Sequence, residues 1–368
     1  MDSTDVFVIG GGPAGLAAAI AARQQGFRVT VADGAQPPID KPCGEALMPD
    51  GMSALERLGI NFAVQECYPL RGVRFFASGM AADAEFPERC GVGVRRTTLH
   101  RILTERAQSL GIDFLWRTPV TGISGQSVCL GNRSVSAKWI VGADGGNSRV
   151  RRWAGLDAYY RKNFRYAFRR HYRITPWSDR MEVHWGPHCQ VYVAGVNEEQ
   201  TCVGLISHDS KLRLGEALYD FPELNARLGT AESASAERGD VSVTRTLKRV
   251  CRNNVALIGD ASGAVDAVTG EGLSLGFGQA LLLADCLRDG DLERYQKGHR
   301  RLALRPLLMA RLMLTLDQRP RLQRRTLQVF LRRPELFRRL VSLHVGVLSP
   351  LHLALDGLNL GWGLLTAS

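Results

Sequence analysis

A strand, a glycine-rich turn and a helix near the N-terminus constrain the fold of this chain more than any other feature. The apolar run VFVI predicts a strand buried on both faces, and G-x-G-x-x-G follows it with glycines at Gly10, Gly12 and Gly15. An alanine-rich helix and a second strand, RVTVAD, complete the unit. That strand ends at Asp33, where an acidic residue accepts hydrogen bonds from a ribose hydroxyl. This order is typical of a Rossmann-like α/β fold.

Each residue of the turn has a mechanical reason to be there in a dinucleotide site. Gly10 permits the tight turn, Gly12 lets a pyrophosphate approach the backbone, and Gly15 lets the helix pack on the strand. The helix opens with Pro13 and Ala14, and its free N–H groups attract phosphate. The unit therefore predicts a bound dinucleotide, but it leaves FAD, NAD and NADP open.

Two later segments repeat the pattern of a strand that ends at an aspartate. WIVGADGG places Asp144 after one apolar run, and VALIGD places Gly259 and Asp260 after another. Ligands bind open α/β sheets in the crevice outside the carboxyl ends of the strands. A single aspartate after a strand is often only a turn residue. Three such strand ends in one chain predict a common ligand crevice.

Glycines crowd the start of the helix that follows the last of these strands. In TGEGLSLGFGQALLLAD, Gly270 and Gly272 precede a helix expected to begin near Leu273. Glycine is costly in a helix, so this density suggests a backbone that approaches a ligand with its N–H groups and positive helix end. Glu271 is expected to point away from a ligand edge that becomes negative.

The net charge of +11 is concentrated near the C-terminus. Residues 299–340 contain twelve arginines, opposed only by Asp317 and Glu335. Helical spacing of leucine and methionine predicts helices there, separated at Pro306, Pro320 and Pro334. This basic region could be a solvated helical cap, a face lying on anionic lipid, or a docking surface for an acidic carrier protein. Nucleic acid is not expected, because no binding module accompanies the charge.

The remaining composition bounds the class of protein. Eight cysteines are scattered without a C-x-x-C pair, which predicts neither a disulfide framework nor a metal site and fits a reducing cytosol. No run of eighteen apolar residues occurs, so a membrane-spanning helix is not expected. We expect a cytoplasmic protein, peripheral to the membrane if its basic region lies on lipid. The apolar tail 341–368 is a candidate lining for the entrance to an apolar substrate cavity.

The combination of these motifs resembles the FAD-dependent flavoprotein monooxygenase superfamily, which includes p-hydroxybenzoate hydroxylase, geranylgeranyl reductases and flavin-dependent halogenases. The resemblance covers roughly residues 5–290. It implies FAD as the cofactor. It also implies NADPH or NADH as a transient reductant without a Rossmann domain of its own, because the chain has no second G-x-G-x-x-G.

The same resemblance assigns cofactor contacts along the chain. The first motif would hold the FAD pyrophosphate, Asp144 would lie beside it, and Asp260 would meet the ribityl chain. Arg96, in VRRTTLHRIL, would contact FAD, although His100 stands where the family has aspartate. The backbone of Val120 would frame the adenine. The full set of implied FAD contacts is Gly10, Gly12, Pro13, Ala14, Gly15, Asp33, Lys41, Gly44, Arg96, Val120, Asp144, Gly259, Asp260, Gly270, Gly272 and Leu273.

The family also implies the architecture. We expect a Rossmann-like FAD-binding domain of the glutathione-reductase type, an antiparallel β-sheet substrate domain and a C-terminal helical segment. The FAD-binding domain would be discontinuous, formed by residues 1–70, 90–160 and 250–290. The substrate-binding sheet would come from residues 71–89 and 161–249, and residues 291–368 would form the basic helical region.

One segment bears on the branch of the family. DKPCGEALMPDGM resembles the K-x-C-G segment of geranylgeranyl reductases through Lys41, Cys43 and Gly44, and in relatives this segment passes near the flavin ring. Cys43 is therefore either a catalytic residue beside the flavin or a small buried apolar residue. Glu45 is either a proton donor or hydrogen-bond partner near the ring, or an acid in the first turn of a helix that is stabilised by the helix dipole.

The resemblance implies an enzyme but leaves its reaction open. Family abundance favours an FAD-dependent, NAD(P)H-driven monooxygenase of secondary metabolism. It would hydroxylate or epoxidise an apolar, aromatic or polyketide-like metabolite through a flavin hydroperoxide. The alternative is a reductase of C=C bonds in a prenyl or acyl chain, and a third possibility is a flavin-binding protein without turnover. A halogenase is disfavoured, because the chain lacks a W-x-W-x-I-P element.

Overall fold

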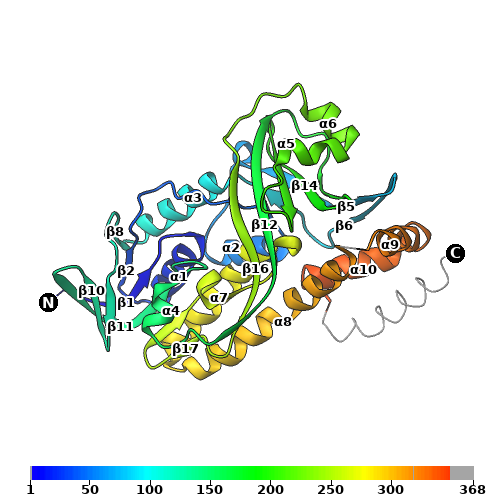
Figure 1. The fold of residues 1–368 in the computed structure, drawn as a ribbon. Coiled ribbons are helices and arrows are strands. Elements are labelled where there is room, and N and C mark those ends of the chain that lie inside the picture. The colour runs from blue at the N-terminus through cyan, green and yellow to red at the C-terminus, as the bar shows by residue number, and fades with distance from the viewer. Residues whose placement is uncertain (1, 318, 349–368) are drawn as a thin grey trace.

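The computed structural model describes residues 2–317 and 319–348 and shows two large β-sheets surrounded by helices (Figure 1). The apolar tail, whose expected place was the mouth of a cavity, lies outside the described residues from position 349 onward. No helix in the described ranges combines the length and the apolar character that crossing a membrane requires.

The first eight-stranded sheet is built around the N-terminal motif. Its central strands run parallel in the order β18–β11–β1–β2–β8, and β17 pairs antiparallel at one edge. The hairpin β9–β10 extends antiparallel from β11. The bounds are β1 (Asp2–Ile9), β2 (Val29–Ala32), β8 (Asp113–Leu115), β9 (Gly122–Ser124), β10 (Ser127–Leu130), β11 (Arg133–Gly142), β17 (Cys251–Arg252) and β18 (Val255–Leu257). The predicted α/β class with its parallel core is confirmed.

The parallel direction of these strands positions the site. Because β18, β11, β1 and β2 are neighbours, their carboxyl ends meet at one edge of the sheet. The glycine turn, the Asp144 loop, the Asp260 loop and Asp33 each follow one of these ends directly. Sequence segments up to about 250 positions apart therefore border one crevice.

Helices cover this sheet and bring further segments to the crevice. They are α1 (Pro13–Gln24), α2 (Pro49–Arg57), α3 (Arg96–Ser109), α4 (Arg149–Trp153) and α7 (Gly272–Asp289). Helix α7 packs closely on α1, since a Cβ added at Gly276 would lie 3.5 Å from the Cβ of Ala14. A small sheet, β3 (Ala46–Leu47), β7 (Gly91–Gly93) and β4 (Tyr68–Leu70), joins the segment after Cys43 to the start of α3.

The second eight-stranded sheet has the order β19–β16–β12–β15–β14–β13–β5–β6. Its bounds are β5 (Gly72–Ala77), β6 (Met80–Glu85), β12 (Tyr159–Arg173), β13 (Arg180–Trp185), β14 (Cys189–Asn197), β15 (Gln200–Ser207), β16 (Arg238–Leu247) and β19 (Gly263–Ala264). The expected antiparallel pairing is found throughout except between β13 and β5, which run parallel. The hairpin β5–β6 comes from far earlier in the chain, so no tight turn dictates its direction beside β13.

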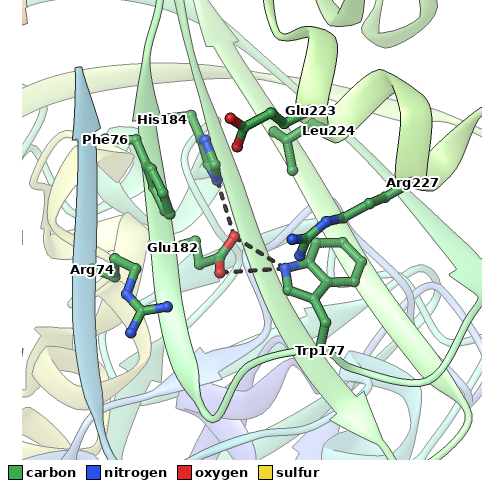
Figure 2. Close-up of a pocket in the computed structure, with 8 residues that line it drawn as sticks. All are labelled: Arg74, Phe76, Trp177, Glu182, His184, Glu223, Leu224 and Arg227. Atoms are coloured by element: carbon green, nitrogen blue, oxygen red, sulfur yellow. Dashed lines mark hydrogen bonds and ion pairs between the residues drawn. The ribbon is translucent and has the colours of Figure 1, made fainter. Parts of the chain in front are cut away.

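The two faces of this sheet carry different helices. Along β13, Met181, Val183 and Trp185 share an apolar cluster with helices α9 (Pro320–Arg332) and α10 (Pro334–His344). The alternate residues Glu182 and His184 face α6 (Pro222–Leu228), which with α5 (Leu214–Ala217) covers the other side (Figure 2).

A cavity of about 220 Å³ lies between β5, β13 and α6, apart from the predicted cofactor contacts (Figure 2). Three of its polar groups hydrogen-bond to one another, since Glu182 accepts from His184 Nε2 (3.0 Å) and Trp177 Nε1 (3.3 Å). The ring of Phe76 stacks on His184 at 4.2 Å. We assign this cavity to packing of the outer face of the sheet.

The C-terminal helices differ from the sequence expectation at one proline. Helix α8 (Leu292–Asp317) continues through Pro306, where a break was expected, because Pro306 is buried in packing contacts that hold the helix past the missing hydrogen bond. Pro320 and Pro334 do begin helices α9 and α10, at the position where proline costs least.

A buried arginine joins the second sheet to the glycine-rich loop and to α8. Arg165 of β12 is fully buried and forms ion pairs with Asp266 and, at 3.1 Å, with Asp317 at the end of α8. Asp266 also accepts a hydrogen bond from the backbone of Val268 (3.0 Å), in the turn η4 (Ala267–Thr269). The loop that leads into α7 is therefore held from both sides.

Candidate cofactor and active site

The glycines of the first motif divide into two groups by what surrounds them. A Cβ added at Gly10 would lie 2.4 Å from the carbonyl oxygen of Ala143, and one at Gly15 would lie 1.9 Å from that of Gly10. Packing therefore requires both. A Cβ added at Gly12 would meet nothing within 4 Å, and Gly12 begins α1 without a side-chain cap. The N-terminus of α1, opening with Pro13 and Ala14, thus faces open space.

Asp33 and His100 hold this turn in place. Asp33 accepts hydrogen bonds from the backbone N–H groups of Gly11 (2.7 Å) and Ala35 (2.7 Å). The buried His100 lies with Nε2 2.8 Å from the carbonyl oxygen of Gly11, to which it donates. Burial lowers the pKa of His100, so the ring is neutral. An aspartate, which the family has at this position, could not donate to the carbonyl of Gly11 when ionised. The need for a donor gives a physical reason for His100 here.

The adenine end of the predicted site is lined by a residue that sequence reasoning missed. Trp116 packs so closely on the turn that a Cβ added at Gly11 would lie 2.3 Å from its ring. Val120 is buried in the core behind it, and the intervening Thr118 donates its backbone N–H to the carbonyl of Asp33 (2.9 Å). No spacing rule singles out Trp116, because it follows β8 in an ordinary loop.

Asp144 and Asp260 lie at the same crevice but play different parts. One oxygen of Asp144 accepts from the backbone N–H groups of Arg149 (2.6 Å) and Val150 (3.1 Å), which caps α4. Its other oxygen is buried without a partner among the described residues. Asp260 is open to the crevice. The protein atoms around its carboxyl still raise the pKa by desolvation, and the positive charges of Lys41 and Arg96 oppose that rise.

Lys41 brings three of the predicted segments together. Its Nζ lies 3.0 Å from where a Cβ would stand on Gly145, next to Asp144, and its charge acts on Asp260. Beside it, a Cβ added at Gly44 would meet nothing within 4 Å. The K-x-C-G segment therefore borders the same open space as the strand ends.

The glycine-rich loop presents backbone to that space. Helix α7 begins at Gly272, one residue before the predicted Leu273, and a Cβ on Gly272 would again meet nothing within 4 Å. Gly270 has φ +66°, which favours glycine. The buried carboxyl of Glu271 contacts Arg305 of α8 (3.2 Å), and burial raises its pKa.

These residues fit a bound FAD. Gly12, Gly44 and Gly272 leave open space at three points of one crevice, and two helix N-termini without side-chain caps border it. The unpartnered oxygen of Asp144 and the open carboxyl of Asp260 supply acceptors for hydroxyl groups. The individual contacts assigned by sequence remain predictions, and the structure brings their segments to one place.

Glu45 is buried in a network rather than open to the crevice. Its Oε1 accepts the backbone N–H of Arg96 at the start of α3 (2.9 Å), and its Oε2 lies 2.5 Å from Nε2 of His171. The guanidinium groups of Arg169 (3.7 Å) and Arg95 (4.0 Å) lie around it. With φ +58°, Glu45 occupies a backbone region that non-glycine residues rarely adopt. This geometry favours a positioning role.

The protonation of His171 follows from its neighbours. Arg169 can only donate, and its Nη1 lies 3.0 Å from Nδ1 of His171, so that nitrogen is the acceptor and Nε2 carries the proton. His171 therefore donates to Glu45. Burial lowers the pKa of His171, which keeps the ring neutral beside two arginines. Sequence reasoning missed both β12 residues, because only their alternation along one strand points them at Glu45.

Cys43 and Cys202 both lie near Glu45. Cys43 is half-buried, and its Sγ accepts the backbone N–H of Glu45 at 3.4 Å. Cys202 is buried, and its Sγ lies within 4.8 Å of ligand atoms of Glu45 and His171. Burial raises the pKa of Cys202 well above its usual range, so the thiol stays protonated. A protonated thiol, a protonated His171 Nε2 and adjacent guanidinium groups all oppose a bound cation.

Tyr192 of β14 joins the second sheet to the glycine-rich loop. Its hydroxyl donates to Oε1 of Gln190 (2.5 Å) and lies 3.4 Å from the carbonyl of Val268. Burial raises the pKa of this phenol, so it is neutral. The second sheet thus contributes a polar wall next to the loop before α7.

Three side chains support the Asp260 loop from behind. Oε1 of Gln279 in α7 accepts the backbone N–H of Gly259 (2.9 Å). This contact fixes the orientation of the Gln279 amide, so its Nε2 donates to Nε2 of His299 (3.0 Å). Ser262 lies 2.9 Å from the same ring nitrogen. This nitrogen therefore carries no proton, and burial lowers the pKa of His299 to about 4.

We predict that His299 makes stability fall in acid. Its folded pKa of about 4 lies below the ordinary 6.5, so between these pH values the unfolded chain binds a proton that the folded chain does not. This contribution is complete above pH 6.5 and is lost as the pH falls toward 4. Between pH 7 and pH 5, the free energy of unfolding of the parent chain should fall by about 2 kcal/mol more than that of His299→Gln. Urea unfolding at the two pH values measures both changes. Equal losses in both proteins would contradict the assignment.

The two groups of glycines predict opposite outcomes for the same substitution. Gly12→Ala places a methyl group in open space, so the free energy of unfolding without FAD should stay within about 0.5 kcal/mol, while the FAD dissociation constant rises at least about tenfold. Gly15→Ala, the matched control, should destabilise the protein by about 1–3 kcal/mol even without FAD. Denaturant unfolding and FAD titration measure both. Parent-like FAD binding by Gly12→Ala would overturn the placement of the cofactor.

Comparison with known proteins agrees with this geometry. A family model described as an FAD binding domain matches residues 3–211, more than half of the chain. The menaquinone reductase of Mycobacterium tuberculosis is 27% identical over 325 residues, covering 80% of this chain and 78% of that protein. Digeranylgeranylglycerophospholipid reductase 1 of Methanococcoides burtonii is 26% identical over 300 residues, covering 74% of this chain and 71% of that protein.

A solved structure shows the same fold over almost the whole chain. It is a flavoprotein/dehydrogenase from Cytophaga hutchinsonii, with a TM-score of 0.84 and 20% identity, and the match covers 98% of this chain and 100% of that one. The family match, the shared fold and the crevice at the strand ends agree. The chain therefore belongs to the FAD-binding-domain family of the flavoprotein monooxygenase superfamily, and it is an FAD-binding oxidoreductase of its monooxygenase and reductase branches.

Proposed function

We propose that this oxidoreductase reduces a carbon–carbon double bond in an apolar, prenyl- or acyl-type chain. The observation that carries the proposal is the place of Cys43. Its half-buried thiol belongs to the K-x-C-G segment that borders the crevice, between Lys41 and the buried Glu45. The two relatives compared above are both named as reductases, and one name specifies a geranylgeranyl lipid.

The reaction requires a hydride on one carbon and a proton on the other. Bound FAD, reduced by NADPH or NADH, supplies the hydride. Cys43 Sγ–H gives the proton, and its thiolate is stabilised by the backbone N–H of Glu45, which already lies 3.4 Å from the sulfur. Because Cys43 is only half-buried, water can return the proton and complete the cycle.

The other residues of the site hold the reacting groups. The N-terminus of α7 directs positive potential to the crevice, where negative charge is stabilised. Glu45 fixes the K-x-C-G segment against α3 and β12, so that Cys43 keeps one position. Arg165 and Tyr192 of the second sheet hold the loop before α7 through Asp266 and Val268.

Monooxygenation is the second candidate, and it is supported by the superfamily to which the chain belongs. It shares FAD and NAD(P)H with the reductase reaction but consumes oxygen and adds an oxygen atom to an apolar aromatic or polyketide-like substrate. The two reactions can be separated by the need for oxygen and by the product.

We expect double-bond reduction without oxygen. The purified protein, incubated anaerobically with NADPH and either digeranylgeranylglycerophospholipid or menaquinone, should form a product with one C=C bond fewer, as measured by mass spectrometry. Cys43→Ala should lower the rate by on the order of 10²-fold while FAD content stays unchanged, because it removes a general acid. Cys90→Ala changes an exposed cysteine and is the matched control.

Two outcomes would contradict the proposal. A product carrying an added oxygen atom, formed only after oxygen is admitted, would establish monooxygenation instead. Full reduction of the double bond by Cys43→Ala would leave the reductase reaction in place but remove Cys43 as the proton donor.

A further inference from the structure

The outer surface of the C-terminal helices carries an unusual concentration of exposed arginines. We call it the arginine face. It comprises Arg300, Arg301, Arg311, Arg319, Arg321, Arg324, Arg325, Arg332, Arg333, Arg338 and Arg339, all exposed. The exposed acids of the same helices are Glu293 and Glu335, while Asp317 is turned inward to Arg165. The face is therefore strongly positive.

Helix α9 shows how the fold separates charge from core. Leu327, Val329 and Phe330 are buried in the cluster that packs on the second sheet. Arg321, Arg324, Arg325, Leu331 and Arg332 are exposed. Each lies three, four or seven positions from another member of the set, so they lie along one side of the helix.

The arginines of α9 differ from many exposed arginines elsewhere in the protein. Arg28, Arg89 and Arg173 each form an ion pair with a neighbouring acid. Within the described ranges, no arginine of α9 has such a partner. Their charge is therefore not compensated within the part of the chain that the structure describes, which leaves them available to an external anion.

Exposed leucines are interspersed with these cations. Leu304 of α8 is 49% exposed, and Leu331 of α9 is 51% exposed. Guanidinium groups pair well with phosphate, and leucines between them can enter the boundary between headgroups and acyl chains. Helix α8 alone spans about 39 Å, so the surface is long and mixed. The headgroup phosphates of a bilayer form an extended plane, which fits the length of this surface better than a compact acidic protein does.

We infer that helices α8–α10 dock this protein on an anionic lipid surface, with the arginine face toward the headgroups. The surface is connected to the candidate site. Arg305 of α8 contacts Asp50 of α2 and reaches Glu271 at the start of α7 (3.2 Å), and the end of α8 pairs with Arg165. The helices that would dock therefore also contact the loop that borders the crevice. Binding to lipid is separate from the proposed reaction, because it can be measured without turnover.

Co-sedimentation of the full chain, with FAD bound, tests the inference directly. The protein should bind vesicles in which about a third of the lipid is phosphatidylserine, and not vesicles of phosphatidylcholine alone. Binding should weaken as salt is raised, because the charges are exposed. The triple variant Arg321→Gln/Arg324→Gln/Arg325→Gln should lower the vesicle partition coefficient by on the order of 10²-fold.

A control with the same change in net charge separates local from global effects. Arg57→Gln/Arg133→Gln/Lys211→Gln removes three exposed cations from other elements and should bind almost as the parent does. Flavin absorbance checks that each variant is folded. Equal loss of binding in both variants would overturn the inference in favour of net charge alone. No binding to anionic vesicles, or retention on an immobilised acidic carrier protein instead, would overturn it as well.

Discussion

The buried carboxylate of Glu45 is the interaction on which the arrangement of the site depends. It accepts the first N–H of α3, receives a hydrogen bond from His171 of β12, and anchors the backbone that carries Cys43 and Lys41. The segment that carries Glu45, the start of α3 and strand β12 lie far apart in the sequence. One carboxylate therefore joins all three. The left-handed backbone of Glu45 is an unfavourable conformation that these contacts over-determine. Without its charge, Arg95 and Arg169 would lie close together with less compensation.

The same principle recurs at each loop that borders the crevice. A loop made of glycines offers backbone to a cofactor but has no side chains with which to hold itself. Buried polar groups from other elements do so instead: His100 for the first turn, Gln279 and His299 for the Asp260 loop, and Arg165 for the loop before α7. Rigidity at the crevice is thus supplied from outside it, which favours a preorganised site.

The sequence reveals what is encoded locally and hides what depends on distant contacts. The strand–turn–helix unit, the strand ends at Asp144 and Asp260 and the start of α7 follow from short-range rules, and each element formed as predicted. Arg169, His171 and His299 carry no motif, because a strand residue or a helix residue gains its role only from the segment that packs on it. The break expected at Pro306 failed for the same reason, since packing held the helix together. Monooxygenases and reductases share the FAD-binding motifs, so these motifs do not select the reaction, and family abundance placed monooxygenation first. Only the K-x-C-G segment around Cys43 bears on the choice.

Hydrogen exchange followed by mass spectrometry on Glu45→Gln tests the central role of this carboxylate most directly. The variant keeps the shape of the side chain and an acceptor for Arg96, but it removes the charge and sets an amide donor against Nε2 of His171. The account predicts faster exchange in three separate segments together, residues 41–47, 95–99 and 169–173, while the rest of the first sheet is unchanged. An effect confined to residues 44–46 would contradict it, because Glu45 would then hold only its own turn.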